Sequence, residues 1–177
     1  MSLSLGFLSV RQHAEHGYFG GYLITNQTAR PLEFHCTMPV KPSRAQELLY
    51  GTTIDAFICG EQIAKALVTK AKVKPHLVLA DSPATLALAC VSDVPTALLH
   101  FDEEHPNQAF RLPCGYAGEL LDFTVGAWQL SLLASHHQWQ TLFSQTLADL
   151  ESRFDLTEPF GRVSDALLEA HPIAKAA

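Results

Sequence analysis

Residues 75–83 read PHLVLADSP, and this stretch decides the fold class. Its apolar run predicts a short buried strand that ends at Asp81. Ser82 is a typical helix N-cap. Pro83 suits the first helical position, because a backbone N–H at that position makes no hydrogen bond within the helix and proline loses nothing by lacking one. The stretch therefore predicts a strand that runs directly into a helix.

The residues that follow extend this pattern into a crossover unit. Residues 83–90 form the predicted helix, and residues 95–101, PTALLHF, predict a second buried strand. A strand, a helix and a strand joined by short links form a right-handed crossover between parallel strands. We therefore expect the strands at 76–80 and 95–101 to be parallel neighbours.

The N-terminal part has a different pattern. Loosely alternating apolar residues predict three strands with short links, at residues 3–10, 18–25 and 31–38. Short links favour an antiparallel meander. The Gly20-Gly21 pair inside the second strand indicates a bulge or a close backbone approach, and a bulge is the preferred interpretation.

Helical patterns occupy most of the remaining sequence. Ser43 with Gln46 three residues later predicts a capping box. Helices are expected at residues 43–50, 53–72, 119–154 and 161–170. The chain is interpreted as one α/β domain over residues 1–177, with a C-terminal helical extension from about residue 119.

The resulting element order is β-β-β-α-β-α-β-α. It predicts a mixed five-stranded sheet, with the meander followed by parallel crossover strands and with helices packed against the sheet. This order resembles the ribonuclease H-like fold, which implies the spatial strand order 3-2-1-4-5. Profilin-like and roadblock-like α/β sandwiches are the alternatives. Such a likeness of element order does not carry a function with it.

Composition narrows the class of protein. The chain has 177 residues, with 12 Lys and Arg against 18 Asp and Glu, a net charge of −6 and 17% charged residues. An apolar content of 47% excludes a disordered chain, and the acidic balance argues against a nucleic-acid partner. No apolar run is long enough for a membrane span, and no signal peptide is evident. We expect a cytoplasmic protein with no membrane partner, whose four cysteines are free thiols.

The charge deficit is local. Residues 123–148 contain no charged residue. If residues 119–154 are one helix, Trp128 and Trp139 share a face, and the opposite face is polar but uncharged. Because interfaces are depleted of charge and enriched in aromatic residues, this helix predicts self-association as a homodimer or contact with a protein partner.

Two acids follow the predicted parallel strands. Asp81 ends the first, and Asp102 ends the second, with Glu104 and His105 close behind. Ligands of open α/β sheets bind outside the carboxyl ends of the strands, so these four residues form the candidate ligand site. Two converging carboxylates there would suit metal-dependent phosphoryl chemistry, and the loop at 102–118 would roof a small-molecule pocket. The alternative is a solvated loop beside a helix start.

The sequence lacks the residue patterns of several other kinds of active site. Nucleases with a ribonuclease H-like fold carry an acid on the central first strand, but residues 3–10 contain none and Arg11 follows them. No nucleophile elbow, phosphate-binding loop or zinc-ligand spacing is present. The pattern thus assigns no metal ligands and no cofactor. The lysines at 65, 70, 72 and 74 are interpreted as a solvated helix end.

Several short stretches resemble an uncharacterised bacterial protein family: Gly20-Gly21-Tyr22-Leu23, Arg30-Pro31-Leu32-Glu33-Phe34, Leu49-Tyr50-Gly51 and Glu158-Pro159-Phe160. The resemblance spans most of the chain and implies no activity. The leading hypothesis is a non-catalytic α/β domain that acts through self-association or a protein partner. The alternative is a metal-dependent hydrolase or phosphoryl-transfer enzyme that uses Asp81 and Asp102, so the sequence leaves open whether the protein is an enzyme.

Overall fold

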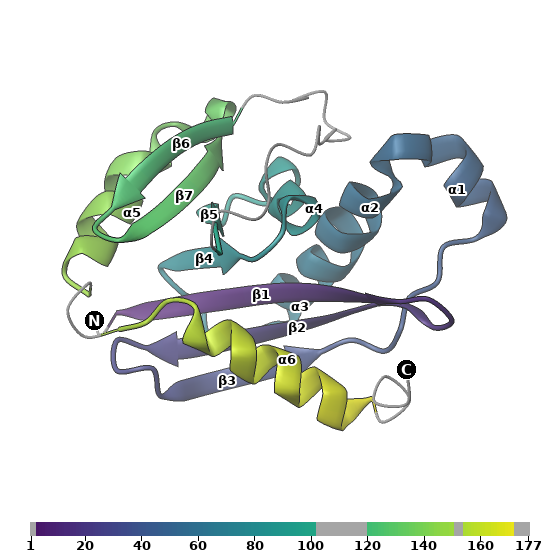
Figure 1. The fold of residues 1–177 in the computed structure, drawn as a ribbon, viewed down its shortest axis with the longest axis horizontal. Helices are drawn as coiled ribbons and strands as arrows, with labels where there is room; N and C mark the ends of the chain where they lie inside the picture. The colour runs from purple at the N-terminus through teal and green to yellow at the C-terminus, as the bar shows by residue number, and fades with distance from the viewer. Residues whose placement is uncertain (1–2, 102–119, 151–153, 172–177) are drawn as a thin grey trace.

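The structure is a computed structural model that describes residues 3–101, 120–150 and 154–171. It contains one open sheet of seven strands in the order β3-β2-β1-β4-β5-β7-β6 (Figure 1). The strands are β1 (Ser4–His13), β2 (Gly17–Asn26), β3 (Pro31–Cys36), β4 (Leu77–Ala80), β5 (Thr96–Leu99), β6 (Leu120–Val125) and β7 (Trp128–Leu133).

The pairing confirms the predicted order of the first five strands. β1, β2 and β3 are antiparallel neighbours, whereas β4 is parallel to β1 and β5 is parallel to β4. The expected count of five strands is wrong, because β7 pairs antiparallel with β5 and β6 pairs antiparallel with β7. This added hairpin lies inside the segment for which one long helix was expected.

The hairpin follows from alternation that the helical interpretation overlooked. Phe123, Val125 and Leu130 are buried on one face of the sheet, whereas their strand neighbours point away from it. Gly126 takes a φ of 58° in the two-residue turn between the strands, a conformation that glycine adopts without strain. The two tryptophans therefore share no helical face, because Trp128 lies in β7 and Trp139 begins a separate helix.

The remaining elements are helical. The Ser43–Gln46 capping box is confirmed, and so is the Ser82 cap with Pro83 in the first turn. The segment expected as one helix over 53–72 is helical over 54–70, with a π-helical middle. The helical elements are α1 (Arg44–Tyr50), η1 (Gly51–Thr53), α2 (Ile54–Ala56), η2 (Phe57–Ala64), α3 (Lys65–Lys70), α4 (Pro83–Leu86), η3 (Ala87–Cys90), η4 (Ala134–His136), α5 (Trp139–Ala148) and α6 (Glu158–Ala170).

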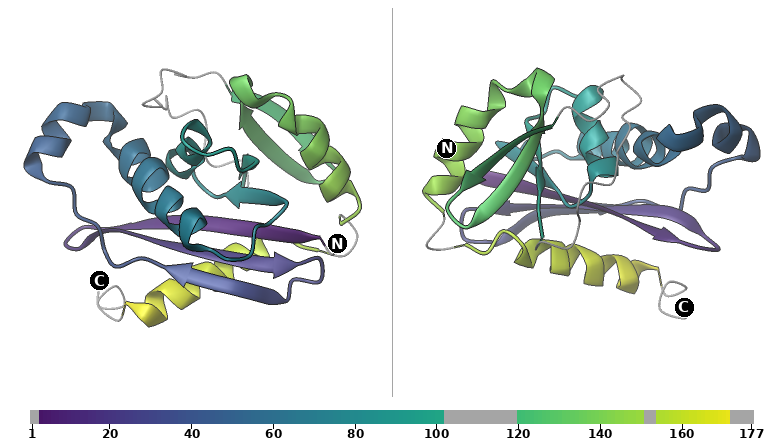
Figure 2. Two further views of the ribbon diagram at one scale, coloured as in Figure 1. Left: turned by 180° about the vertical axis from the view of Figure 1, so that it is seen from behind. Right: turned by 45° about the horizontal axis from the view of Figure 1, so that its top comes forward.

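Helices cover both faces of the sheet (Figure 2). One core cluster joins the sheet to α5 and α6, and it contains Phe7, Leu79, Phe143 and Phe160. Two further clusters join the opposite face to η2 and α3 and to α2, α4 and η3. Among the described residues no helix is long and apolar enough to cross a membrane.

The Gly20-Gly21 pair permits this close packing. The pairing of β1 with β2 continues in register through both glycines, so the preferred interpretation as a bulge is wrong. A Cβ at Gly20 would lie 2.3 Å from Ile63 Cγ2, and a Cβ at Gly21 would lie 2.7 Å from Val163 Cγ1. Because neighbouring strand residues face opposite sides, one glycine admits η2 and the other admits α6.

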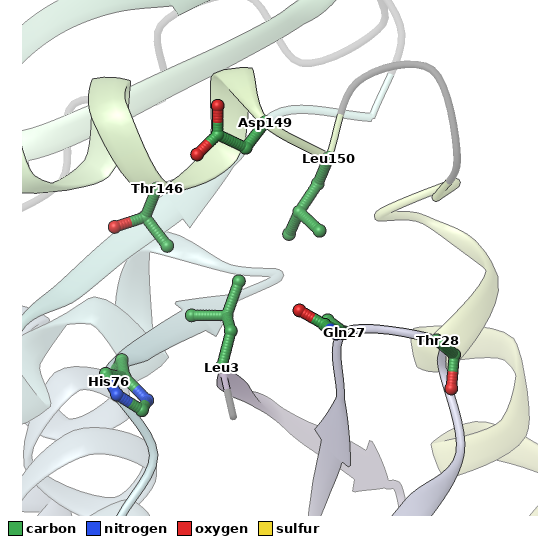
Figure 3. A pocket seen from close by; sticks show the side chains of 7 residues that line it. All are labelled: Leu3, Gln27, Thr28, His76, Thr146, Asp149 and Leu150. Atoms are coloured by element: carbon green, nitrogen blue, oxygen red, sulfur yellow. The ribbon is translucent and has the colours of Figure 1, made fainter. Parts of the chain in front are cut away.

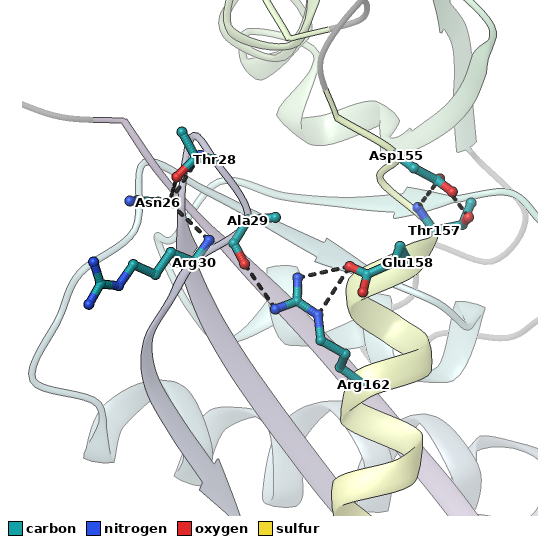
Figure 4. A network of polar contacts seen from close by, with 8 residues as sticks. All are labelled: Asn26, Thr28, Ala29, Arg30, Asp155, Thr157, Glu158 and Arg162. Atoms are coloured by element: carbon teal, nitrogen blue, oxygen red, sulfur yellow. Dashed lines mark hydrogen bonds and ion pairs between the residues drawn. The ribbon is translucent and has the colours of Figure 1, made fainter.

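Arg162 ties α6 to the turn between β2 and β3 (Figure 4). Its Nη1 donates to the carbonyl oxygen of Ala29 at 2.9 Å, while Nε and Nη2 donate to the Glu158 carboxylate. Asn26 Oδ1 holds the turn by accepting the N–H groups of Thr28 and Arg30. Pro159 lies in the first turn of α6, where its missing N–H costs no helical hydrogen bond. These contacts fix the helix that forms one wall of the candidate site.

The cysteines differ from expectation in one case. Cys36 and Cys59 are free, as expected, but Cys90 is disulfide-bonded. A disulfide requires two cysteines whose Cβ atoms are about 4 Å apart in the fold, whatever their separation along the chain. The absence of a Cys-x-x-Cys pair therefore does not exclude one.

Glu33 on β3 ties the sheet to the segment after α3 and gives a testable pH dependence. Its carboxylate accepts the N–H groups of Val73 and Lys72 and contacts His35 Nε2 at 2.5 Å. These contacts lower the pKa of Glu33 from 4.5 to about 2. Because the pKa is lowered in the folded state, this stabilisation is complete above pH 4.5 and is lost as the pH falls toward 2.

Glu33→Gln is therefore expected to remove part of the acid sensitivity of the fold. Urea midpoints across this pH window should fall less steeply for the variant than for the wild type. The exposed Glu15 is the control, and E15Q should leave the slope unchanged. Parallel slopes for wild type and E33Q would show that Glu33 does not contribute.

Candidate functional site

The candidate site lies around Asp81, at the carboxyl end of β4. The parallel register pairs Leu8 with Ala80, so the next residue on each strand, Ser9 and Asp81, are also adjacent. The Ser9 hydroxyl donates to Asp81 Oδ2 at 2.6 Å, and Arg11 Nη1 donates to the same oxygen at 2.7 Å. Two residues of β1 therefore hold one oxygen of this carboxylate.

The other oxygen of Asp81 has no hydrogen-bond partner among the residues that the structure describes. The side chain is only 4% exposed, and Oδ1 is buried without a hydrogen bond. A buried acceptor that lacks a donor is costly, commonly about 1–3 kcal/mol. The Arg11 side chain is 41% exposed, so its remaining N–H groups are available to a ligand. The site thus offers a fixed cation next to a carboxylate oxygen that requires a donor.

These groups line a pocket of about 450 Å³ at the ends of the central strands. Phe101, which follows β5, contacts Phe160 of α6 edge to face at a centroid distance of 5.2 Å. The full lining consists of Arg11, Asp81, Pro83, Leu98, Leu99, His100, Phe101, Phe160, Gly161 and Ser164. The pocket therefore combines an apolar wall with a small set of polar groups, as ligand sites commonly do.

A chain of hydrogen bonds connects β6 and β7 to His100, which is the member of this chain that lines the pocket. Ser131 is fully buried and donates to Asp122 Oδ1 at 2.5 Å, while His100 Nε2 lies 2.6 Å from the same hydroxyl oxygen. Asp122 pairs with Ser131 across the hairpin, and Ser131 lies near His100 because β7 pairs with β5. Sequence reasoning missed this chain because the helical interpretation removed both hairpin strands. The alternation of residues 121–132 could have revealed it.

Of the four predicted ligand residues, the structure places one. Asp81 lines the pocket, whereas Asp102, Glu104 and His105 lie outside the described residues. Arg11, which appeared in the sequence only as a departure from the nuclease pattern, lies within β1 and pairs with Asp81. Ser9 stands where an acid on the first strand would face Asp81.

The described donor set does not fit a divalent metal ion. No group of three or more His, Cys, Asp and Glu side chains that could hold a metal occurs in the part of the chain that the structure describes. Divalent Mg²⁺ prefers several oxygen ligands, whereas Asp81 has one free oxygen and its charge is already compensated by Arg11. We therefore derive no step through a metal ion.

A larger pocket of about 620 Å³ lies elsewhere, near the start of β1 and the turn after β2 (Figure 3). It includes Asp149 and His76, but His76 Nδ1 already accepts the N–H of Ser4 at 3.2 Å. Among the described residues of its lining, no buried side-chain atom lacks a hydrogen-bond partner. The pocket around Asp81 is therefore the stronger candidate.

Thiol chemistry is not favoured near this site. Cys59 in η2 is buried, and burial together with the charges of Asp55 and Asp81 raises the pKa of its thiol to about 12. A thiol with such a pKa is protonated at neutral pH, and the thiolate is the nucleophilic form. Cys59 is therefore a core residue.

Comparison with known proteins gives structural likenesses only. No family model and no curated protein matches the chain. Human ENDOV is similar at 13% identity and a TM-score of 0.45, over 99% of this chain and 87% of that one. Two Ciona intestinalis endonuclease V structures, both in complex with DNA containing an inosine, are similar at 12% and 14% identity. Their TM-scores are 0.42 and 0.38, over 77% and 69% of this chain and 75% and 60% of those.

These findings correct three expectations drawn from the sequence: a non-catalytic domain acting through self-association or a protein partner, a homodimer, and the absence of a nucleic-acid partner. The three solved structures named above are of an endonuclease, and two of them contain DNA. At TM-scores of 0.38 to 0.45 the likeness carries neither site residues nor a substrate over to this chain. The chain's own residues must support any proposed function.

Proposed function

We propose that the protein is a hydrolase or phosphoryl-transfer enzyme that acts on a phosphate ester in the pocket around Asp81. The observation that carries this proposal is the pairing of an exposed guanidinium with a buried carboxylate that has one unpartnered oxygen. A phosphate ester together with an attacking hydroxyl or water presents the two groups that the pocket lacks: an anion for Arg11 and an O–H donor for Asp81 Oδ1.

The geometry supports a simple division of roles. Arg11 keeps one N–H on Asp81 and presents others to the phosphoryl oxygens, whose charge it stabilises. The attacking water donates an O–H to Asp81 Oδ1 and gives up that proton as its oxygen bonds to phosphorus. The bond from phosphorus to the leaving oxygen then breaks, and that oxygen takes a proton from solvent water. Ser9 keeps Oδ2 turned toward β1, so that Oδ1 remains free for this proton.

The proposed fold is ribonuclease H-like. The order β3-β2-β1-β4-β5 and the parallel alignment of β1, β4 and β5 support this assignment, and the β6–β7 hairpin extends the sheet beyond it. Ser9 and Arg11 on β1 replace the acid that metal-dependent nucleases of this fold carry there. A second carboxylate from Asp102 stays a prediction from the sequence, since that residue lies outside the described residues.

Arginine substitution tests the proposed function. Labelled single- and double-stranded DNA and RNA are the first substrates to assay, together with bis(p-nitrophenyl) phosphate. Arg11→Gln should lower kcat/KM by about 10²–10³-fold, because it removes the charge that stabilises the phosphoryl oxygens. Arg44 is exposed and forms an ion pair with Glu47 on its own helix, so it gives the control R44Q, which should retain full activity.

Two further arms sharpen this test. R11K keeps a positive charge beside Asp81. Thermal melting of R11Q and R11K shows whether a loss of activity in either variant follows from a loss of the fold. Turnover should persist in EDTA. Turnover that requires Mg²⁺ would contradict the metal-independent step and would favour the pairing of Asp81 with Asp102, which D102N would then test. A wild type inactive on every phosphate ester would overturn the proposal.

A further inference from the structure

We infer that Phe101 is a stacking platform that selects phosphate esters carrying a flat, unsaturated ring. This inference rests on the proposed function, because it assigns a binding surface to the ester group of the substrate whose phosphate Arg11 binds. The shared chemistry of such esters is a phosphoryl group next to a flat ring, which a nucleobase or another aryl group can supply. The inference is carried by the positions of Arg11 and Phe101, which line the pocket on the two sides of Asp81.

The strand pattern places Arg11, Asp81 and Phe101 on one face of the sheet. Side chains alternate along a strand, so Asp81 shares the face of Leu79 and Phe101 shares the face of Leu99. Leu79 and Leu99 belong to the core cluster that joins the sheet to α5 and α6, and Phe101 packs against the same cluster. Arg11 lies on this face as well, because its guanidinium reaches the Asp81 carboxylate.

The carboxylate lies between the other two side chains across the sheet. β4 is flanked by β1 and β5, and the register pairs Ala80 with Leu8 on one side and with Leu98 on the other. Arg11 and Phe101 each follow these partners by three residues, so they mark the same level beyond the end of β4. Two strand spacings, about 10 Å, separate β1 from β5. The pocket therefore has a cation on one side of the carboxylate and an aromatic ring on the other.

Phe101 keeps ring surface for a ligand. It is half-buried, and its ring meets Phe160 at a centroid distance of 5.2 Å and an interplanar angle of 77°. An edge-to-face contact covers at most one face of a ring, so Phe160 leaves at least one face of Phe101 uncovered. Phe160 is itself buried and packs edge to face against Phe7 at 5.4 Å. Phe101 thus rests on a rigid aromatic support.

The α6 wall leaves room for a ring beside Phe101. Gly161 lines the pocket, and a Cβ at this position would meet no atom within 4 Å. Pro83 and Leu99 add apolar lining, and the volume of about 450 Å³ suits a small organic ligand. A flat unsaturated ring gains from stacking on Phe101, whereas a saturated ring of the same size gains only from the burial of apolar surface.

Matched ligand pairs test this inference by isothermal titration calorimetry, without any need for turnover. Adenosine 5′-monophosphate and ribose 5-phosphate differ by the base, and phenylphosphonate and cyclohexylphosphonate differ by ring unsaturation. The wild type should bind the flat-ring member of at least one pair about 10-fold more tightly. Phe101→Leu should remove this preference, because leucine keeps an apolar side chain without a ring face, and F101W should restore it. The exposed Phe34 of β3 gives the control F34L, which should keep the wild-type preference.

The outcomes separate this inference from the proposed function. A preference confined to the nucleotide pair would identify the ring as a nucleobase, and one confined to the phosphonate pair would identify it as another aryl group. No preference in the wild type, or an unchanged preference in F101L, would overturn the inference and leave the proposed function intact. R11Q should weaken the binding of all four ligands, because they share the phosphoryl group. A wild type that binds none of the four would instead contradict the proposed function.

Thermal melting establishes that each Phe101 variant is folded. If F101L does not fold, F101M provides a second variant without a ring, to which the same expectations apply.

Discussion

Gly60→Ala is expected to destabilise the fold by about 3 kcal/mol, although alanine is the better helix former. A Cβ at Gly60 would lie 2.5 Å from Ala87 Cβ, 2.8 Å from the Ala87 carbonyl carbon and 2.8 Å from the Leu88 nitrogen. Two of these atoms are backbone and cannot rotate away. The variant must therefore separate η2 from η3, which carry buried residues of two core clusters. Urea denaturation measures the change.

Gly161→Ala is the matched control for this experiment. Gly161 also lies within a helix, but a Cβ there would meet no atom within 4 Å. Only the gain in helix propensity remains, so G161A should stabilise the protein by about 0.5–1 kcal/mol. The two substitutions are chemically identical and should have opposite signs. A G60A variant as stable as the wild type would show that η2 and η3 do not pack as closely as described.

Asp81→Asn is expected to reduce the proposed phosphate-ester cleavage by about 10²–10⁴-fold. The amide cannot take the proton of the attacking water, and it leaves Arg11 without its charged partner. Ser9→Ala should have a smaller effect, because it removes one of two hydrogen bonds to Oδ2 and leaves the carboxylate in place. The measurement is kcat with a dinucleoside phosphate, compared with the exposed control E15Q.

Stability and activity must be separated in this experiment. D81N leaves a partly exposed arginine unpaired, a change that the fold tolerates better than a buried unpaired charge. We therefore expect D81N to retain a cooperative urea transition. Full activity in a folded D81N variant would show that the reaction, if present, occurs elsewhere on the protein.

The helix caps and the strand order could be predicted, because they depend on residues close together in the sequence. Ser43 with Gln46, and Ser82 with Pro83, each combine a cap and a helix start within a few residues, and both caps form as expected. The strand order follows from short links in the meander and from the handedness of the crossover. These rules act over short stretches, so they need no knowledge of tertiary contacts.

The β6–β7 hairpin shows why the rest could not be predicted in the same way. Leu121, Val125, Trp128 and Leu132 fit a helical face as well as they fit two alternating strands. The choice depends on β5, whose open edge accepts β7. The uncharged segment at 123–148 is thus not one helix with little free surface. It comprises a hairpin and a short helix, and Thr141, Leu142 and Gln145 of that helix are exposed.

In the candidate site, too, one residue follows from a local rule, whereas the others depend on contacts between distant segments. Asp81 could be predicted, because the carboxyl end of a parallel strand is a general location for ligand sites. The roles of Ser9 and Arg11 depend on the register between β1 and β4, which element order does not specify. The His100 chain depends on the hairpin and was therefore inaccessible once residues 119–154 were interpreted as a helix.

A crystal structure of the protein soaked with tungstate, a heavy-atom analogue of phosphate, tests whether the pocket around Asp81 binds a phosphoryl group. We expect an anomalous peak in the pocket, with one tungstate oxygen on the Arg11 guanidinium and another facing Asp81 Oδ1 through a hydroxyl or water. The same soak of R11Q should leave the pocket empty. Tungstate bound only at other sites, or bound equally in R11Q, would contradict the assignment of this pocket as a phosphoryl site.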